Sequence, residues 1–64
     1  MNRLRQARFE KRKSQLKIYK ETGIFPSYVS WIESGRLNPT EVEKVKLADC
    51  LDVKKDWLFP KEDN

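Results

Sequence analysis

Glycine and proline interrupt this chain so often that only short segments of regular structure can form between them. The interruptions fall at Gly23, Pro26, Gly35, the Asn38–Pro39 pair and Pro60. None of the segments between them alternates apolar and polar residues as a half-buried strand does, and each suits a short helix. The interruptions therefore predict an all-α fold built from short helices.

The first two helices are expected over residues 2 to about 12 and over residues 15–22. On the first, side chains recur at helical spacing along one face, at Leu4, Ala7 and Arg8. Ser14 is a favourable N-cap for the second, and Gly23 is placed to end it in the left-handed conformation.

A third helix is expected from Pro26 to about residue 34, because proline fits the first position of a helix. Phe25 precedes it and should be extended, as residues before proline are, but its side chain cannot act as a cap. Val29 and Ile32 would face the core.

The fourth helix should start at a capping box formed by Thr40 and Glu43 and run to about residue 51. The side chains expected on its inward face are Val42, Val45, Ala48 and Leu51, with Leu47 alongside.

A last short helix is expected near residues 54–59, with Val53 and Leu58 against the core and a stop before Pro60. The five helices would form one compact bundle with a small core. Residues 1–64 are therefore expected to be a single domain.

A chain of 64 residues buries little surface on folding, and neither a disulfide nor a structural metal site is expected to stabilise it. Cys50 is the only cysteine and the chain has no histidine, which excludes an internal disulfide and the usual Cys/His zinc site. We expect Cys50 to be a small helix residue in a reducing compartment. No glycine-rich phosphate loop, ligand cluster or acid/base pair points to an enzyme, a cofactor, a metal or a small-molecule ligand.

Positive charge is concentrated at the start of the chain. Residues 1–20 carry eight lysines and arginines and one acid, whereas residues 21–64 carry six basic and nine acidic residues. The asymmetry favours a polyanionic partner, nucleic acid ahead of an anionic membrane surface.

The N-terminus lacks the apolar region of a signal peptide and the apolar runs are far too short to cross a bilayer, so a cytoplasmic, nucleoid-associated protein is expected.

The segment from Ser14 to Gly35 resembles the helix-turn-helix of the Cro and phage-repressor type (XRE-like) family. The matching positions are Gln15, Ile18, Gly23, Ile24, Val29, Ile32, Glu33 and Gly35. The likeness continues on both sides, at Leu4 to Arg8, at Asn38–Pro39 with Val45, Leu47, Ala48 and Leu51, and at Asp56, Trp57 and Leu58. The chain departs from the pattern at Lys13, Tyr19 and Phe25, where the family has an apolar residue, an alanine and a polar cap.

This resemblance implies a five-helix domain of the phage-repressor type with its motif at about 15–34. The implied function is that of a sequence-specific transcriptional regulator of double-stranded DNA, a repressor, with a recognition helix at about 26–34 in the major groove. Base readout is assigned to Pro26, Ser27, Tyr28 and Trp31. Phosphate contacts are assigned to Gln15, Lys17, Arg36 and Asn38.

The resemblance also implies an ion pair between Arg8 and Glu33 that fixes the angle of the recognition helix. A single recognition helix offers few base contacts, so we expect a homodimer on a palindromic operator, formed from a monomer in solution. The expected dimer contact is the apolar end of the chain, at Trp57, Phe59 and Pro60. The alternative for Trp57 is that it folds back over the core.

Two other functions remain open. The aromatic residues Phe25, Tyr28 and Trp31 suit a protein-interaction module of the same fold, such as an antirepressor or adaptor. A DNA-binding antitoxin of a toxin–antitoxin pair would combine both roles. The operator sequence, and the choice between repression and activation, do not follow from the residues.

Overall fold

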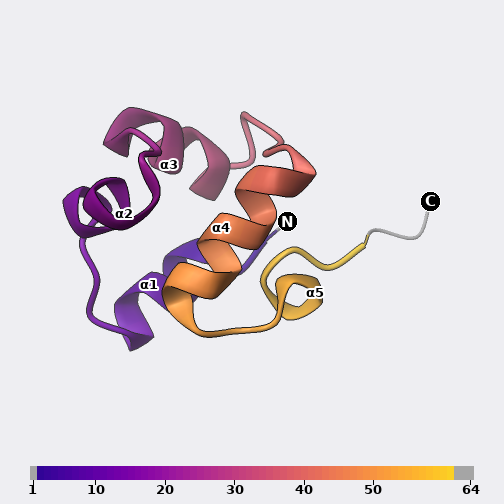
Figure 1. Cartoon of the computed structure of the whole chain (residues 1–64). Coiled ribbons are helices and arrows are strands. Elements are labelled where there is room, and N and C mark those ends of the chain that lie inside the picture. Colours follow the sequence, from indigo (N-terminus) through magenta and orange to yellow (C-terminus); the bar gives the residue numbers. More distant parts are fainter. Residues whose placement is uncertain (1, 62–64) are drawn as a thin grey trace.

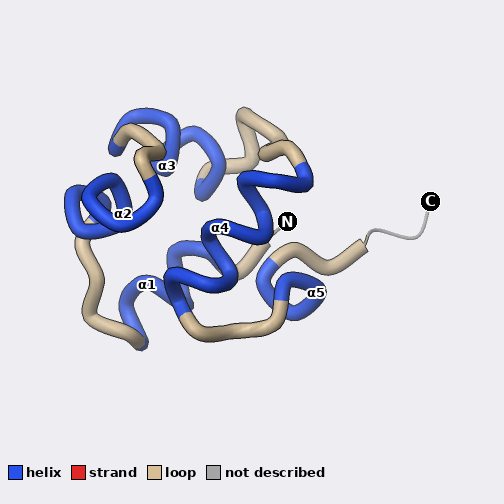
Figure 2. Tube along the Cα trace, in the orientation of Figure 1, coloured by secondary structure: helices blue, strands red, loops and turns tan. Residues whose placement is uncertain are grey.

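Five helices and no strand make up residues 2–61, the part of the chain that the computed structural model describes (Figures 1 and 2). The helices are α1 (Leu4–Glu10), α2 (Gln15–Thr22), α3 (Pro26–Glu33), α4 (Glu41–Leu51) and α5 (Lys55–Leu58). Residue 1 and residues 62–64, the ends of the expected domain, lie outside the described residues. The all-α class and the number of helices are as predicted.

Helix α4 is the central element of the fold. It contacts α2 on one side and α5 on the other, while α1 contacts α3 (Figure 1). The core between the helices consists of Leu4, Ala7, Ile18, Ile24, Val29, Ile32, Leu47, Ala48, Leu51, Leu58 and Phe59. Each helix contributes at least one apolar residue to this single core, so none of the five is an independent unit.

The helix ends follow the local signals in the sequence. The Ser14 hydroxyl accepts a hydrogen bond from the backbone N–H of Lys17 at 3.0 Å. At the start of α4, Thr40 and Glu43 form the complete capping box, with each side chain accepting from the other residue's backbone N–H. Gly23, after α2, has a φ of +80°, a conformation that glycine adopts without steric cost.

Helix α1 is shorter than the sequence suggested. It ends at Glu10 rather than near residue 12, because Arg12 adopts a left-handed conformation with a φ of 55°. The backbone N–H of Lys13 then donates to the Arg8 carbonyl at 2.9 Å and closes the turn. This turn directs Lys13 toward α2 and α4, where its ammonium contacts Glu21 and Cys50.

The expected inward face of α4 was partly wrong. Leu47, Ala48 and Leu51 are buried, but Val42 and Val45 are 64% and 46% exposed. Apolar residues occur on both sides of this helix, and the leucines, which offer more apolar surface than valine, occupy the core side. Val42 and Val45 therefore lie on the outer face.

The C-terminal segment also differs from expectation at one residue. Phe59 is only 8% exposed and belongs to the core, so it does not lie on an exposed dimer surface. Trp57 is half-buried against the core, and the Arg3 guanidinium lies 5.2 Å from its ring centroid. Arg3 also donates to the Trp57 carbonyl at 2.6 Å. Trp57 therefore packs on the core with one part of its surface, as in the alternative, and the other part stays exposed. Pro60 beside Phe59 is half-buried.

None of the helices in the described range has the length and apolar character needed to cross a bilayer.

Candidate nucleic-acid interface

Helix α3 has one buried face and one exposed face. Val29 and Ile32 are completely buried and attach the helix to the core. The opposite face carries four exposed residues at helical spacing, Ser27, Ser30, Trp31 and Ser34, of which the last follows the helix directly. We call these four residues the outer face of α3. Trp31 is 49% exposed, and no acidic side chain belongs to this face.

An ion pair between Arg8 and Glu33 holds the C-terminal end of α3 against α1. Arg8 Nε lies 2.6 Å from Glu33 Oε2, and Arg8 Nη2 donates to the other carboxylate oxygen at 3.4 Å. The two side chains are only 11% and 8% exposed. This pair, which the family resemblance implied, is present in the structure. It ties α3 to α1 with a two-pronged geometry that resists rotation of the helix.

Gln15 joins this ion pair from the first position of α2. Its side-chain amide donates to Glu33 Oε1 at 3.3 Å, which leaves the second N–H of the amide for another acceptor. Gln15 lines a shallow depression together with Ser30 and Ser34 of the outer face and with Arg5 of α1. The structure thus brings the expected phosphate contact Gln15 next to the exposed side of α3.

The depression also identifies residues that sequence reasoning missed. Ser30 and Ser34 follow Ser27 at intervals of three and seven residues, and this helical spacing was a signal for them. Arg5 had only its place in the basic N-terminal segment to mark it. Its guanidinium lies 5.3 Å from the Phe9 ring centroid on α1.

Pro26 and Tyr28, assigned to base readout with Ser27 and Trp31, are half-buried on the flanks of α3. Tyr28 packs against the core and lines a shallow cavity with Glu43 and Lys46 of α4. Of the four assigned residues, only Ser27 and Trp31 belong to the outer face.

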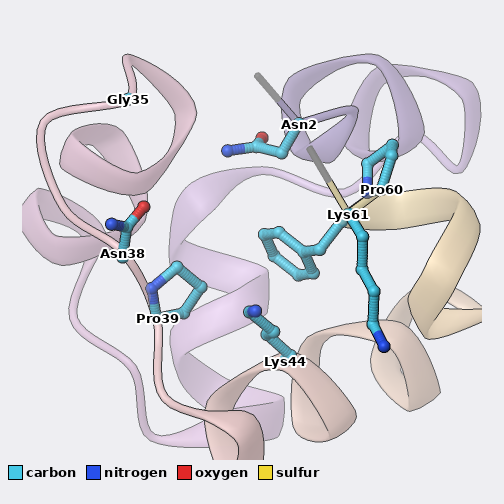
Figure 3. Close-up of a pocket in the computed structure, with 8 residues that line it drawn as sticks. Asn2, Gly35, Asn38, Pro39, Lys44, Pro60 and Lys61 are labelled. Carbon is cyan, nitrogen blue, oxygen red and sulfur yellow. The ribbon is translucent and has the colours of Figure 1, made fainter. Parts of the chain in front are cut away.

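The remaining expected phosphate contacts lie in separate places. Lys17 is exposed on α2, with its ammonium 3.5 Å from Glu21 Oε2. Arg36 is exposed in the loop after α3, where its backbone N–H donates to the Trp31 carbonyl at 2.9 Å. Asn38 lies further along this loop and lines a different cavity, with Lys44 and Lys61 (Figure 3).

Tyr19 and Phe25, which depart from the pattern of the family that the sequence resembles, contact each other. Their rings stack with centroids 5.1 Å apart, and Phe25 is 62% exposed. Tyr19 therefore projects outward instead of occupying the space between α2 and α3. Phe25 is extended and provides no side-chain cap to α3, as expected.

Lys13, Glu21 and Cys50 form a polar cluster where the loop after α1 meets α2 and α4. Cys50 Sγ donates to Glu21 Oε1 at 2.9 Å, and the Lys13 ammonium donates to the same oxygen at 2.7 Å. The hydrogen bond from Cys50, followed by that from Lys13, lowers the pKa of Glu21 to about 2. Burial, and then the bond to Glu21, raises the pKa of the Cys50 thiol to about 11, so the thiol is protonated at neutral pH.

No group of three or more histidine, cysteine, aspartate or glutamate side chains among residues 2–61 is placed to hold a metal ion. Comparison of the chain with models of known protein families, with curated proteins and with solved structures found no match. The function is therefore inferred from the residues of the chain itself, and above all from the outer face of α3.

Proposed function

We propose that the protein is a sequence-specific double-stranded DNA-binding transcriptional regulator, a repressor, that acts through a helix-turn-helix made of α2, the turn at Gly23 and α3. The observation that carries the proposal is the outer face of α3. Its side chains are exposed, do not pack in the core and carry no negative charge. The helix to which they belong is held by the buried Arg8–Glu33 ion pair. A helix with an exposed face of this kind fits the major groove of B-DNA. Such a regulator acts in the cytoplasm, at the nucleoid.

Base readout would come from the exposed side of this helix. The Ser27 hydroxyl can donate to or accept from base edges, and the Trp31 ring can contact a thymine methyl group. Ser30 and Ser34 extend the polar part of the same face and are additional candidates. Pro26 and Tyr28 would act at most from the flanks, because both are half-buried.

Phosphate contacts would come from groups around this face. The second N–H of the Gln15 amide is a donor at the start of α2, and Arg5 is a cation beside the same depression. Lys17 and Arg36 are exposed cations on α2 and in the loop after α3. The positive charge of residues 1–20 supplies the long-range attraction to the phosphate backbone.

A homodimer on a palindromic operator completes the proposal, because the outer face of α3 alone offers few groups for discrimination between sites. With Phe59 in the core, the candidate contact surface is reduced to Trp57 and Pro60, both half-buried. So small a surface favours a protein that is monomeric in solution and pairs on DNA.

A protein-interaction module of the antirepressor or adaptor type is the second candidate. The observation that favours it is the exposure of large apolar side chains at Leu16, Phe25 and Trp31, which are 53%, 62% and 49% exposed. An antitoxin would use this apolar surface for a protein and the outer face of α3 for DNA. Absence of sequence-selective DNA binding would favour the pure interaction module.

Selection of bound sites from random duplex DNA tests the proposed function. The proposal expects enrichment of one sequence with two related half-sites about 34 Å apart along the helix axis. The affinity for the selected site should fall with salt, with log K decreasing by about 0.9 per phosphate contacted for each unit of log salt concentration. Selection that returns no common sequence would contradict the proposal.

A further inference from the structure

The outer face of α3 lacks the long polar side chains that most often distinguish bases in the major groove. It consists of three serines and Trp31. Guanine is usually distinguished by arginine or lysine, adenine by asparagine or glutamine, and cytosine by aspartate or glutamate. None of these residue types belongs to the face. Recognition of a DNA sequence by this face must therefore depend on other contacts.

Two side chains of those types lie beside the face, but both belong to other helices and have partners within the protein. Arg5 of α1 and Gln15 of α2 line the depression next to the outer face. The Arg5 guanidinium lies 5.3 Å from the Phe9 ring centroid, and the Gln15 amide donates to Glu33 Oε1 at 3.3 Å. Their place at the edge of the face suits contacts with the DNA backbone rather than with bases.

The serines of the face can bond to bases but do not select one base by themselves. A hydroxyl group both donates and accepts, so it can pair with several kinds of base edge. The Ser34 hydroxyl already donates to the Trp31 carbonyl at 3.1 Å. Which edge Ser27 or Ser30 meets depends on how the helix lies in the groove. A further contact must set that position.

Trp31 is the one large side chain of the outer face. It is 49% exposed, and its neighbours on the face are all serines, whose side chains are much shorter. Three hydrogen bonds converge on its backbone carbonyl, from the N–H groups of Arg36 and Leu37 at 2.9 and 3.3 Å and from the Ser34 hydroxyl. The exposed part of the indole ring is therefore presented from a backbone that is held in place.

The major groove offers such a ring one kind of apolar group, the methyl on C5 of thymine. The other groups on the base edges are hydrogen-bond donors and acceptors, and contact with an apolar ring would leave them unpaired. A cytosine that is methylated on C5 carries the same methyl group at the same place in the groove. The ring therefore favours base pairs that carry a C5-methyl group, whichever pyrimidine bears it.

We propose that the outer face of α3 recognises DNA by the C5-methyl groups of the major groove, on thymine or on 5-methylcytosine, through contact with Trp31. This inference rests on the proposed DNA-binding function and names the class of duplex on which it acts. The methyl contact sets the position of the helix, and Ser27 and Ser30 then bond to the base edges beside it. Methylation on C5 of a cytosine at the contacted position therefore strengthens binding.

Single methyl groups can be removed from the selected duplex, or added to it, without another change in the base edges. Deoxyuridine in place of thymine removes one, and 5-methylcytosine in place of cytosine adds one. Competition titrations of the full chain at one salt concentration measure each effect. We expect deoxyuridine to weaken binding about fourfold at about one or two positions in each half-site, the loss expected for one buried methyl-sized group. With cytosine at such a position, methylation on C5 should strengthen binding by about the same factor.

Two variants assign the effect to a side chain. Trp31→Ala should bind the thymine and deoxyuridine duplexes equally, because the ring that contacts the methyl group is gone. Val45→Ala is the matched control, since Val45 is also apolar and is 46% exposed but lies on the outer side of α4. It should keep the difference between the two duplexes. The comparison of the duplexes with the wild type needs no variant, so it does not depend on any effect of a substitution on folding.

Two results would overturn the inference and leave the proposed function intact. One is a wild type that distinguishes the selected duplex from a scrambled one but binds thymine and deoxyuridine equally at every position. The other is a Trp31→Ala variant that retains the full effect of the methyl group. A wild type that does not distinguish the selected from the scrambled duplex would instead overturn the proposed function, and the inference with it.

Discussion

Arg8 Nε and Glu33 Oε2 lie 2.6 Å apart and connect the first helix of the fold to the last residue of α3. Both side chains are about nine-tenths buried, so neither charge can be hydrated if its partner is removed. The orientation of the outer face of α3 therefore depends on a contact outside the α2–α3 segment.

Removal of either partner should destabilise the fold strongly. Arg8→Met or Glu33→Leu alone leaves a buried charge unpaired, and we expect each to lower the free energy of unfolding by about 3–5 kcal/mol. The double variant should be more stable than the sum of the two losses predicts. Urea denaturation of the four proteins measures this coupling, and strictly additive losses would contradict a structural role for the pair.

Acid should destabilise the fold through Glu21. Its pKa is lowered from an ordinary value of 4.5 to about 2, chiefly by the hydrogen bond from Cys50 and then by Lys13. A carboxyl whose pKa is lowered by folding stabilises the native state above pH 4.5, and this contribution is lost as the pH falls toward 2. Glu21→Gln should flatten the decline in melting temperature over this window, and Glu10→Gln, on the exposed side of α1, is the control. Parallel pH profiles for the wild type and Glu21→Gln would contradict this role of Glu21.

Phosphate contacts should be separable from base contacts. Gln15→Ala should weaken binding to all DNA sequences alike, because phosphates carry no sequence information. Arg36→Ala should likewise weaken binding to all DNA sequences, and it should also reduce the salt dependence of the affinity by about one phosphate contact. Filter-binding or fluorescence titrations on selected and scrambled duplexes provide both quantities. A loss confined to the selected duplex would show that the residue reads bases.

The proposed dimer predicts two protein molecules on each selected duplex. Sedimentation of the complex measures the stoichiometry directly. Trp57→Lys should lower the cooperativity of binding, whereas Val42→Lys, on the exposed face of α4, should leave it unchanged. Thermal melting of Trp57→Lys provides the necessary check on folding, because Trp57 also packs against the core. A one-to-one complex on the best site would contradict the dimer.

Local signals in the sequence predicted the helix boundaries well, because caps and breakers act within a few residues. Ser14, Gly23 and the capping box at Thr40 all have the conformations expected from their residue types. The inward face of α4 was less predictable, because apolar residues occur on both of its sides, the leucines on one and the valines on the other. Contacts with α2 and α5, which are not local, determine which side is buried.

The contacts of Lys13, Tyr19 and Phe25 could not be predicted from the sequence either. These three residues depart from the pattern of the family that the sequence resembles. Lys13 stands where the family that the sequence resembles has an apolar residue, and its contact with Cys50 joins residues 37 positions apart. Tyr19 stacks on Phe25 across the turn between α2 and α3. Phe59 was assigned to the surface because Val53 and Leu58 were expected to pack against the core at this end of the chain, whereas both Leu58 and Phe59 are buried.

The most direct test of the central claim is the ratio of affinities for the selected duplex and a scrambled duplex at one salt concentration. The account predicts a ratio of about 10³ or more for the wild type. Ser27→Ala and Trp31→Ala should each lower the difference in binding free energy between the two duplexes by about 1–3 kcal/mol. Val42→Ala, on the far side of α4 from the core, should leave this difference unchanged. A wild-type ratio near one, or a ratio that both α3 variants leave unchanged, would contradict sequence readout by the outer face of α3.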